Sequence, residues 1–196
     1  IPPLHSKDHV PMTDSPNERI PKSLRRALLS FLITCLVRNM RGEIYSHKTM
    51  LVHVTRLKDV QDRIAKIIEE ELEEYREIIF EDGSERKNNL IKELESIWME
   101  DFEKFKDKSP HLYYPKITDL FKDKELKVTI QNIAANVKCL NSNTPKDKEL
   151  DYEGYKRKNG LGLTTVVIGG EKLTRGLTLE GLTISYFLRT ARHPMY

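Results

Sequence analysis

Two stretches in the first half of the chain place apolar side chains three or four residues apart, a spacing that aligns them on one face of a helix. The first begins at Pro21, where a first helical turn tolerates the missing N–H, and ends at Gly42. The second covers residues 57–79. Between them, residues 50–54 form a short apolar run that is typical of a strand. The pattern predicts a helix, a strand and a longer helix.

The helical spacing resumes after Asp82-Gly83, which marks a break. Ser84 is the expected N-cap of a third amphipathic helix, and the apolar positions continue toward residue 108. A shorter helix is predicted somewhere between residues 117 and 135.

The last third of the chain predicts three strands, at residues 136–141, 164–168 and 183–188. Residues 142–163 are polar and rich in turn formers, so a long surface loop is expected there. Strands that are separated by helices and are apolar almost throughout imply a parallel sheet covered on both faces. The predicted fold class is α/β, with residues 84–108 as a helical insertion.

The N-terminal region has no apolar period. Residues 1–21 hold five of the nine prolines, which predicts an extended arm over residues 1–20 and one domain over residues 21–196. We interpret the chain, which begins with Ile1, as a piece of a larger polypeptide.

Composition narrows the class of protein. The net charge of +3 permits nucleic acid as a partner without requiring it. Two cysteines, Cys35 and Cys139, do not suggest a disulfide framework or a zinc site. No apolar stretch approaches the roughly 18 residues that span a bilayer, and no signal peptide is apparent, so we expect no membrane partner and a cytoplasmic location.

The segment "VVIGGEKLTRGLTLEGLTIS" at residues 166–185 contains four of the nine glycines. It lacks both the G-x-x-x-x-G-K-[ST] order of a phosphate loop and the G-x-G-x-x-G order of a dinucleotide site. One interpretation is purely structural, because glycines permit unusual backbone angles at strand ends. The other is functional: Lys172, Thr174 and Arg175 would face a nucleic-acid backbone from the carboxyl ends of parallel strands.

A metal-dependent nuclease is an alternative, since such sites often use an acidic-x-Lys triplet. Glu85-Arg86-Lys87 and Glu125-Leu126-Lys127 match, but both lie in charge-rich stretches that are expected to be helical. His5 and His9 are surrounded by prolines, and His53 is better explained as a hydrogen-bonded core residue than as a ligand. No metal-binding residue is therefore assigned.

The segment "VVIGGEKLTRGLTLEGLTISYFLR" resembles the signature of the Z1 domain, a helicase-like domain of bacterial and phage-defence polypeptides that is also described as an endonuclease. The resemblance covers most of residues 20–196. It includes, in the family's order, "KSLRRALLSFLITCLVR" (22–38), "HKTMLVHVTRLKDVQ" (47–61), "CLNS" (139–142) and "LDY" (150–152).

The resemblance implies the second RecA-like domain of a superfamily 2 helicase. Thr55 and Arg56 would then approach the nucleic-acid backbone, together with Lys172 and Thr174. Arg175 and Gly176 would act as the catalytic pair that links bound DNA to the ATP cleft. Thr178 stands where many helicases have an acidic residue, which weakens the nucleotide-side role of that position.

The resemblance also implies that parts of a motor lie outside this chain, because it contains no phosphate-loop lysine and stops before the family's last arginine-rich motif. We expect the parent to be an ATP-dependent DNA translocase of a defence system that uses ATP and Mg²⁺, and this piece alone to bind neither and to hydrolyse nothing. The expected partners are DNA and other domains or subunits of the parent. A third hypothesis is a non-catalytic docking module formed by the insertion at residues 84–108.

Overall fold

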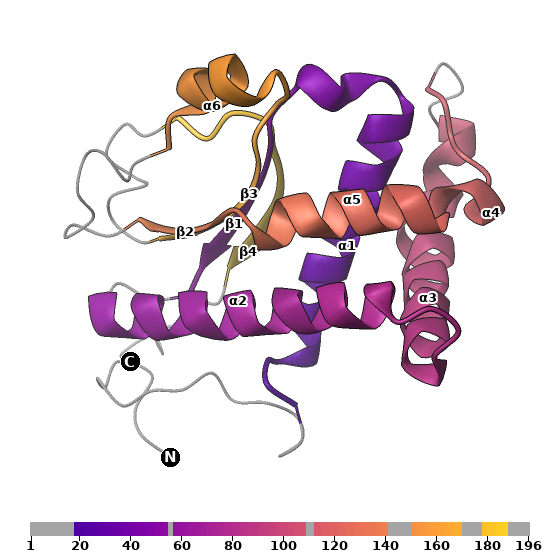
Figure 1. Ribbon diagram of the computed structural model, residues 1–196, viewed down its shortest axis with the longest axis horizontal. Coiled ribbons are helices and arrows are strands. Elements are labelled where there is room, and N and C mark those ends of the chain that lie inside the picture. The colour runs from indigo at the N-terminus through magenta and orange to yellow at the C-terminus, as the bar shows by residue number, and fades with distance from the viewer. Residues whose placement is uncertain (1–17, 55–56, 109–111, 141–149, 170–177, 188–196) are drawn as a thin grey trace, which may run out of the picture.

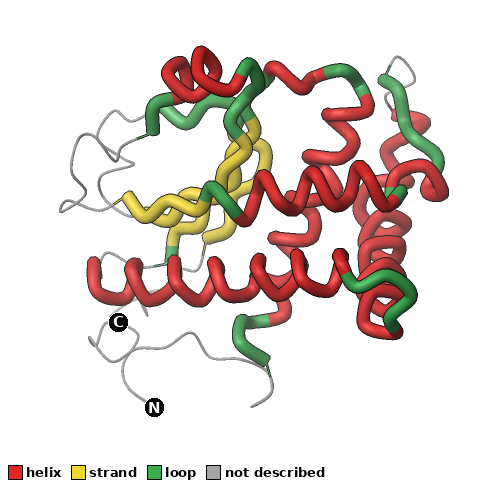
Figure 2. The backbone as a smooth tube through the Cα atoms, in the orientation of Figure 1, coloured by secondary structure: helices red, strands yellow, loops and turns green. Residues whose placement is uncertain are grey.

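The computed structural model describes residues 18–54, 57–108, 112–140, 150–169 and 178–187 (Figure 1). The predicted arm lies mainly outside these ranges, as do His5 and His9. Within them, helices and strands alternate along the chain, as the α/β prediction requires. Figure 2 shows the strands gathered into one sheet, with long helices packed against it.

Four strands form one sheet in which every neighbouring pair is parallel. They are β1 (Lys48–His53), β2 (Val137–Leu140), β3 (Thr164–Gly169) and β4 (Leu182–Phe187), in the order β2-β3-β1-β4. The register pairs Met50 with Val166 and Val52 with Ile168. The sheet is therefore parallel as predicted, and β1 lies between the two strands that flank the glycine-rich segment.

The largest hydrophobic cluster lies on one face of this sheet, and Leu51 and Val167 on the other face are buried as well. Met50, Val52, Val166 and Ile168 belong to one buried cluster with the apolar residues of three helices: α1 (Lys22–Met40), α2 (Lys58–Phe80) and α5 (Asp123–Ala134). Removing these side chains from water stabilises the fold by roughly 25 cal/mol for each Å² of apolar surface. Because α1 is buried on several sides, it carries nine buried residues.

Arginines of α1 hold two further elements. Arg25 lies 3.0 Å from Glu71 of α2 and 2.8 Å from Glu93 of α3 (Glu85–Ile97). The hydrogen bond from Arg25 to Glu93 raises the pKa of the guanidinium, outweighing the effect of its partial burial. Arg26 pairs with Glu100 and Asp101 just beyond α3. These bridges fix the predicted insertion against the core.

The insertion begins as predicted but does not remain α-helical. Ser84 caps α3, since its side-chain oxygen accepts a hydrogen bond from the N–H of Lys87 at 3.0 Å. The backbone then widens into a π-helix at Trp98–Phe102 and tightens into a 3-10 helix at Glu103–Lys108. Apolar spacing does not reveal these helix types here, because segments of five and six residues are too short to show their own periods.

The shorter helix predicted between residues 117 and 135 is α5, and the one-turn helix α4 (Ile117–Leu120) precedes it. One other expectation needs correction. The loop predicted at residues 142–163 contains α6 (Tyr152–Asn159). Only Tyr152 of α6 is buried, so no apolar period marks this helix. Its ends do carry signals: Asp151 caps the first turn and Gly160 ends the last with a left-handed backbone.

None of the helices in the described ranges combines the length and the apolar character needed to cross a membrane.

Candidate functional site

All six residues predicted to contact nucleic acid or to couple it to ATP lie outside the described ranges: Thr55, Arg56, Lys172, Thr174, Arg175 and Gly176. The structure does place the residues that flank them. β1 ends at His53 and β3 ends at Gly169, on neighbouring parallel strands. The segments 55–56 and 170–177 therefore both begin at the carboxyl ends of neighbouring strands, on the same edge of the sheet.

His53 joins the two strand ends at this edge. Its Nδ1 lies 2.9 Å from the carbonyl oxygen of Gly169. Since a carbonyl can only accept, Nδ1 carries the proton and donates it. The ring also lies 5.5 Å from the ring of Phe187, at the end of β4. His53 is hydrogen-bonded as predicted, but it is only half-buried and not a core residue, and its contacts connect the carboxyl ends of β1, β3 and β4.

The amino end of α2 lies beside this edge, because only residues 54–57 separate β1 from α2. The first N–H groups of a helix have no partner within the helix, and they carry the positive end of its dipole. Such an end favours phosphate groups. Asp59 in the first turn offsets part of that positive field.

The glycine-rich segment returns to the sheet at the opposite edge. β4 begins after Gly181, whose carbonyl accepts a hydrogen bond from the N–H of Thr49 at 3.0 Å. Gly181 has φ of 64°, and a Cβ there would overlap the carbonyl oxygen of His47. Residues 170–181 therefore lead from the carboxyl end of β3 to the amino end of β1, and their last residue can only be glycine without strain.

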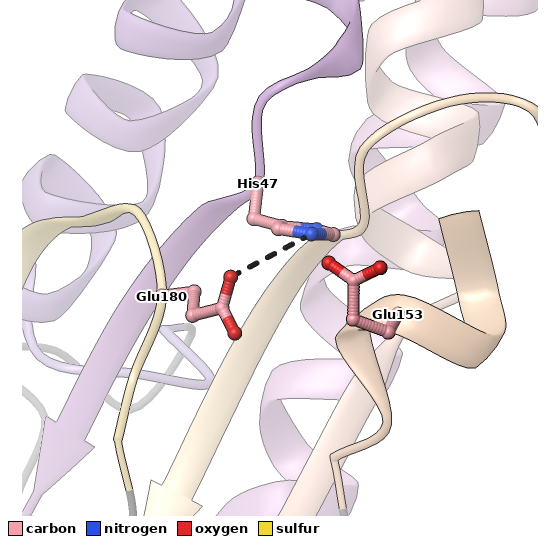
Figure 3. A group of neighbouring side chains, drawn as sticks. All are labelled: His47, Glu153 and Glu180. Atoms are coloured by element: carbon pink, nitrogen blue, oxygen red, sulfur yellow. Dashed lines mark ion pairs between the residues drawn. The ribbon is translucent and has the colours of Figure 1, made fainter. Parts of the chain in front are cut away.

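Three side chains from separate parts of the chain meet at this amino edge (Figure 3). His47 points from the start of β1 toward the carboxylates of Glu180, which precedes β4, and Glu153 of α6. One ligand-type atom from each lies within 4.8 Å of the others. The Nε2 of His47 is buried, has no hydrogen-bond partner among the described residues, and lies 3.8 Å from Glu180 Oε2.

One nitrogen and two carboxylates are donors that suit a divalent cation. The hydrogen bond at Nδ1 of His47 shows whether Nε2 is free to bind a metal. Nδ1 of His47 accepts a hydrogen bond from the N–H of Leu163 at 2.9 Å, so the neutral ring carries its proton on Nε2. A metal ligand needs a free lone pair at that atom, and its second nitrogen normally donates. The arrangement instead directs a protonated Nε2 toward the two carboxylates, with Glu180 Oε2 3.8 Å away.

Two hydroxyl groups, of Thr49 and Tyr152, form hydrogen bonds at the amino edge of the sheet. Thr49 Oγ1 donates to the carbonyl of Glu180 at 2.7 Å, so the hydroxyl of Tyr152, 2.9 Å from Thr49 Oγ1, donates to Thr49. Burial raises the pKa of Tyr152, and the charge of Glu180 acts in the same direction. The tyrosine therefore remains a neutral donor, and the end of the glycine-rich segment is held to β1 and α6.

The lysines of the two acidic-x-Lys triplets are engaged in ion pairs. These lysines, Lys87 and Lys127, lie next to each other and both pair with Asp82 and Asp123. The hydrogen bond from Lys87, followed by that from Lys127, lowers the pKa of Asp82 to about 2. These four residues tie the turn before α3 to α5. Because the lysines neutralise Asp82 and Asp123, this cluster has a structural role.

Sequence reasoning did not identify His47, Tyr152, Glu153 or Glu180 as neighbours. The signals were slight: a histidine at the start of a strand, an acidic residue before Gly181 and a D-Y-E triplet within a polar stretch. None of these spacings suggests contact, because only the order of the strands brings the three segments together.

Comparison with known families gives one match. The family model described as the Z1 domain matches residues 23–195. No curated protein and no solved structure matches the chain.

Proposed function

We propose, from the premise that the chain belongs to the Z1 domain family, that it forms the DNA-contacting, RecA-like half of an ATP-driven helicase-like motor. In this role the chain binds the phosphate backbone of DNA. The ATP-binding lysine and the residues that hold Mg²⁺ belong to other parts of the parent protein.

The observation that carries the proposal is the pairing of β1 with β3. His53 and Gly169, at the carboxyl ends of these strands, lie within one hydrogen bond of each other. Thr55 and Arg56 follow the first strand, and Lys172, Thr174 and Arg175 follow the second. In open parallel sheets, ligands bind at the carboxyl ends of the strands. The pairing supports one shared role for two segments that are far apart in the sequence.

The chemistry of these segments suits a phosphate backbone better than a base edge. They offer three cations, two hydroxyls and a glycine-rich backbone, and the amino end of α2 adds a positive dipole at the same edge. Contacts of this kind position a protein on nucleic acid without reading its sequence. We expect affinity for DNA to fall steeply with salt and to vary little with base sequence.

Coupling to ATP is assigned to Arg175 and Gly176. They lie in the segment that leaves the carboxyl edge of the sheet at Gly169 and reaches the amino edge at Gly181. The carbonyls of Gly169 and Gly181 accept hydrogen bonds from His53 and Thr49 of β1. Because both ends are fixed, a displacement imposed on the segment by ATP is transmitted to β1 and β4, and so to Thr55 and Arg56.

The test is an Arg175→Ala change in the parent polypeptide. We expect DNA-stimulated ATP turnover to be lost, because bound DNA would no longer be linked to the ATP cleft, while the far-ultraviolet circular dichroism stays the same. The matched control is Arg157→Ala, at an exposed position of α6. Unchanged turnover in Arg175→Ala would overturn the assignment.

The nuclease alternative makes a different prediction, namely Mg²⁺-dependent cleavage of plasmid DNA that disappears in Glu85→Gln or Glu125→Gln. The ion pairs of Lys87 and Lys127 argue against it, because both lysines are engaged by Asp82 and Asp123 and so are not available to polarise a metal-bound water. Purified chain incubated with plasmid and Mg²⁺ should leave the DNA intact.

A further inference from the structure

A small aromatic pocket lies on the side of α1 that faces the insertion. It encloses about 220 Å³ between the last turns of α1 and the segment that follows α3. Trp98 forms its buried floor, and Phe102 stacks on Trp98 with 5.7 Å between ring centroids and 5° between ring planes. Phe105 and Leu112 stand at its mouth with 43% and 41% of their surface exposed.

The backbone at the floor is unusual. Trp98–Phe102 is a π-helix, in which the N–H of Glu103 bonds to the carbonyl of Trp98. π-helical turns are rare and frequently occur at functional sites. Here the wider turn carries the stacked rings of Trp98, which forms the floor of the pocket, and Phe102, which forms one wall. The indole N–H of Trp98 donates to Glu103 at 2.7 Å, which fixes the ring in place.

Cations surround the pocket. The guanidinium of Arg41 lies 5.4 Å from the ring centroid of Tyr114, and the ammonium groups of Lys104 and Lys108 lie 5.4 and 5.3 Å from that of Phe105. Within the described part of the chain, none of these three cations forms an ion pair with a carboxylate, whereas Arg38, which also lines the pocket, pairs with Glu43. An exposed apolar mouth with unpaired cations favours a ligand that is apolar at its centre and negative around it.

We propose that this pocket is a docking site for an acidic segment of a partner protein, which inserts one aromatic side chain between Phe102 and Leu112 and places carboxylates beside Arg41 and Lys108. The volume lies below the range of about 300–1,000 Å³ that is usual for small-molecule sites and suits a single anchoring side chain. Buried aromatic anchors of this kind dominate many protein interfaces. The site is independent of the proposed DNA-contacting edge.

Three synthetic peptides test the proposal by ¹⁵N NMR titration of the 196-residue chain. The first has five residues, with tryptophan at its centre and acidic residues on both sides. The second replaces each acid with lysine, and the third replaces the tryptophan with alanine. We expect the first to shift the indole N–H resonance of Trp98 and the amides of Thr34 and Val37, with at least tenfold weaker binding for the other two.

A pair of variants locates the binding. Leu112→Glu places a negative charge at the mouth and should weaken the acidic peptide at least tenfold. Leu161→Glu is the control, since Leu161 has the same 41% exposure and lies in the turn before β3. Equal binding of the acidic and basic peptides would overturn the proposal, as would equal effects of the two variants. So would a DNA oligonucleotide that moves the Trp98 indole resonance more than the acidic peptide does.

Discussion

The ring of His47 accepts a hydrogen bond from the backbone N–H of Leu163, with 2.9 Å between Leu163 N and His47 Nδ1. At the other end of β1, His53 donates from its Nδ1 to Gly169. The two histidines therefore require opposite neutral tautomers. Each holds one end of the connection between β3 and β4, because His47 also faces Glu180.

The tautomers are directly measurable. At a pH where both rings are neutral, we expect His47 to carry its proton on Nε2 and His53 on Nδ1, since an N–H donor faces the first and a carbonyl faces the second. Long-range ¹H–¹⁵N correlation spectra of the imidazole rings distinguish the two forms. A proton on Nδ1 of His47 would contradict the assignment and reopen Nε2 as a metal ligand.

The hydrogen bond from Leu163 to the His47 ring can be tested by urea unfolding. In His47→Phe, which keeps a ring but leaves the N–H unpaired, we expect a loss of about 1–3 kcal/mol in the free energy of unfolding.

Gly181 should be intolerant of a side chain. Gly181→Ala combines an unfavourable positive φ with overlap against the His47 carbonyl, so we expect a loss of at least about 2 kcal/mol in urea unfolding. The control is Gly160→Ala, because Gly160 has φ of 69° but open space around it. Its loss should be about 1 kcal/mol. Equal losses would show that the contact with His47 has no weight.

The carboxylates of Asp82 and Asp123 should resist acid. Their partners Lys87 and Lys127 hold the pKa of Asp82 at about 2, against an ordinary value of 3.8. A lowered pKa means that this stabilisation is complete above the ordinary value and is lost as the pH falls through about 2. In Lys127→Gln, the ¹³C carboxyl titration of Asp82 should move to higher pH. An unchanged midpoint would mean that the bridge does not form in solution.

The two cysteines should differ in reactivity. Burial raises the pKa of Cys35 to about 12, while Cys139 is only partly buried. Because the thiolate is the reactive form, a thiol reagent at pH 8 should modify Cys139, whose thiol contacts Asp62 at 3.2 Å, faster than Cys35 in the folded protein, and Cys35 only on unfolding. A Cys139→Ser variant should show almost no reaction until denaturant is added, and rapid labelling of that variant would contradict the burial of Cys35.

The sequence predicted most helices and strands because their apolar spacing is strong and local. The pattern from Leu24 onward, the Ser84 cap and the β-branched run before Gly169 all use interactions within a few residues. α6 was missed because only Tyr152 is buried, and a polar helix leaves its capping residues as the only signal. The π-helix at Trp98 was missed because it shares the apolar face of the α-helix before it.

For the candidate site, the sequence alone identified the Z1 signature and the residues that suit a phosphate backbone, because family motifs and charges are written in the chain itself. Only the tertiary structure decided which strand ends and which side chains are neighbours. The strand order β2-β3-β1-β4 places the end of β1 against the end of β3, and it brings His47 to Glu180 and Glu153. These contacts depend on how strands distant in sequence pair, and the energy that selects one pairing comes from burying the whole face of the sheet against α1, α2 and α5.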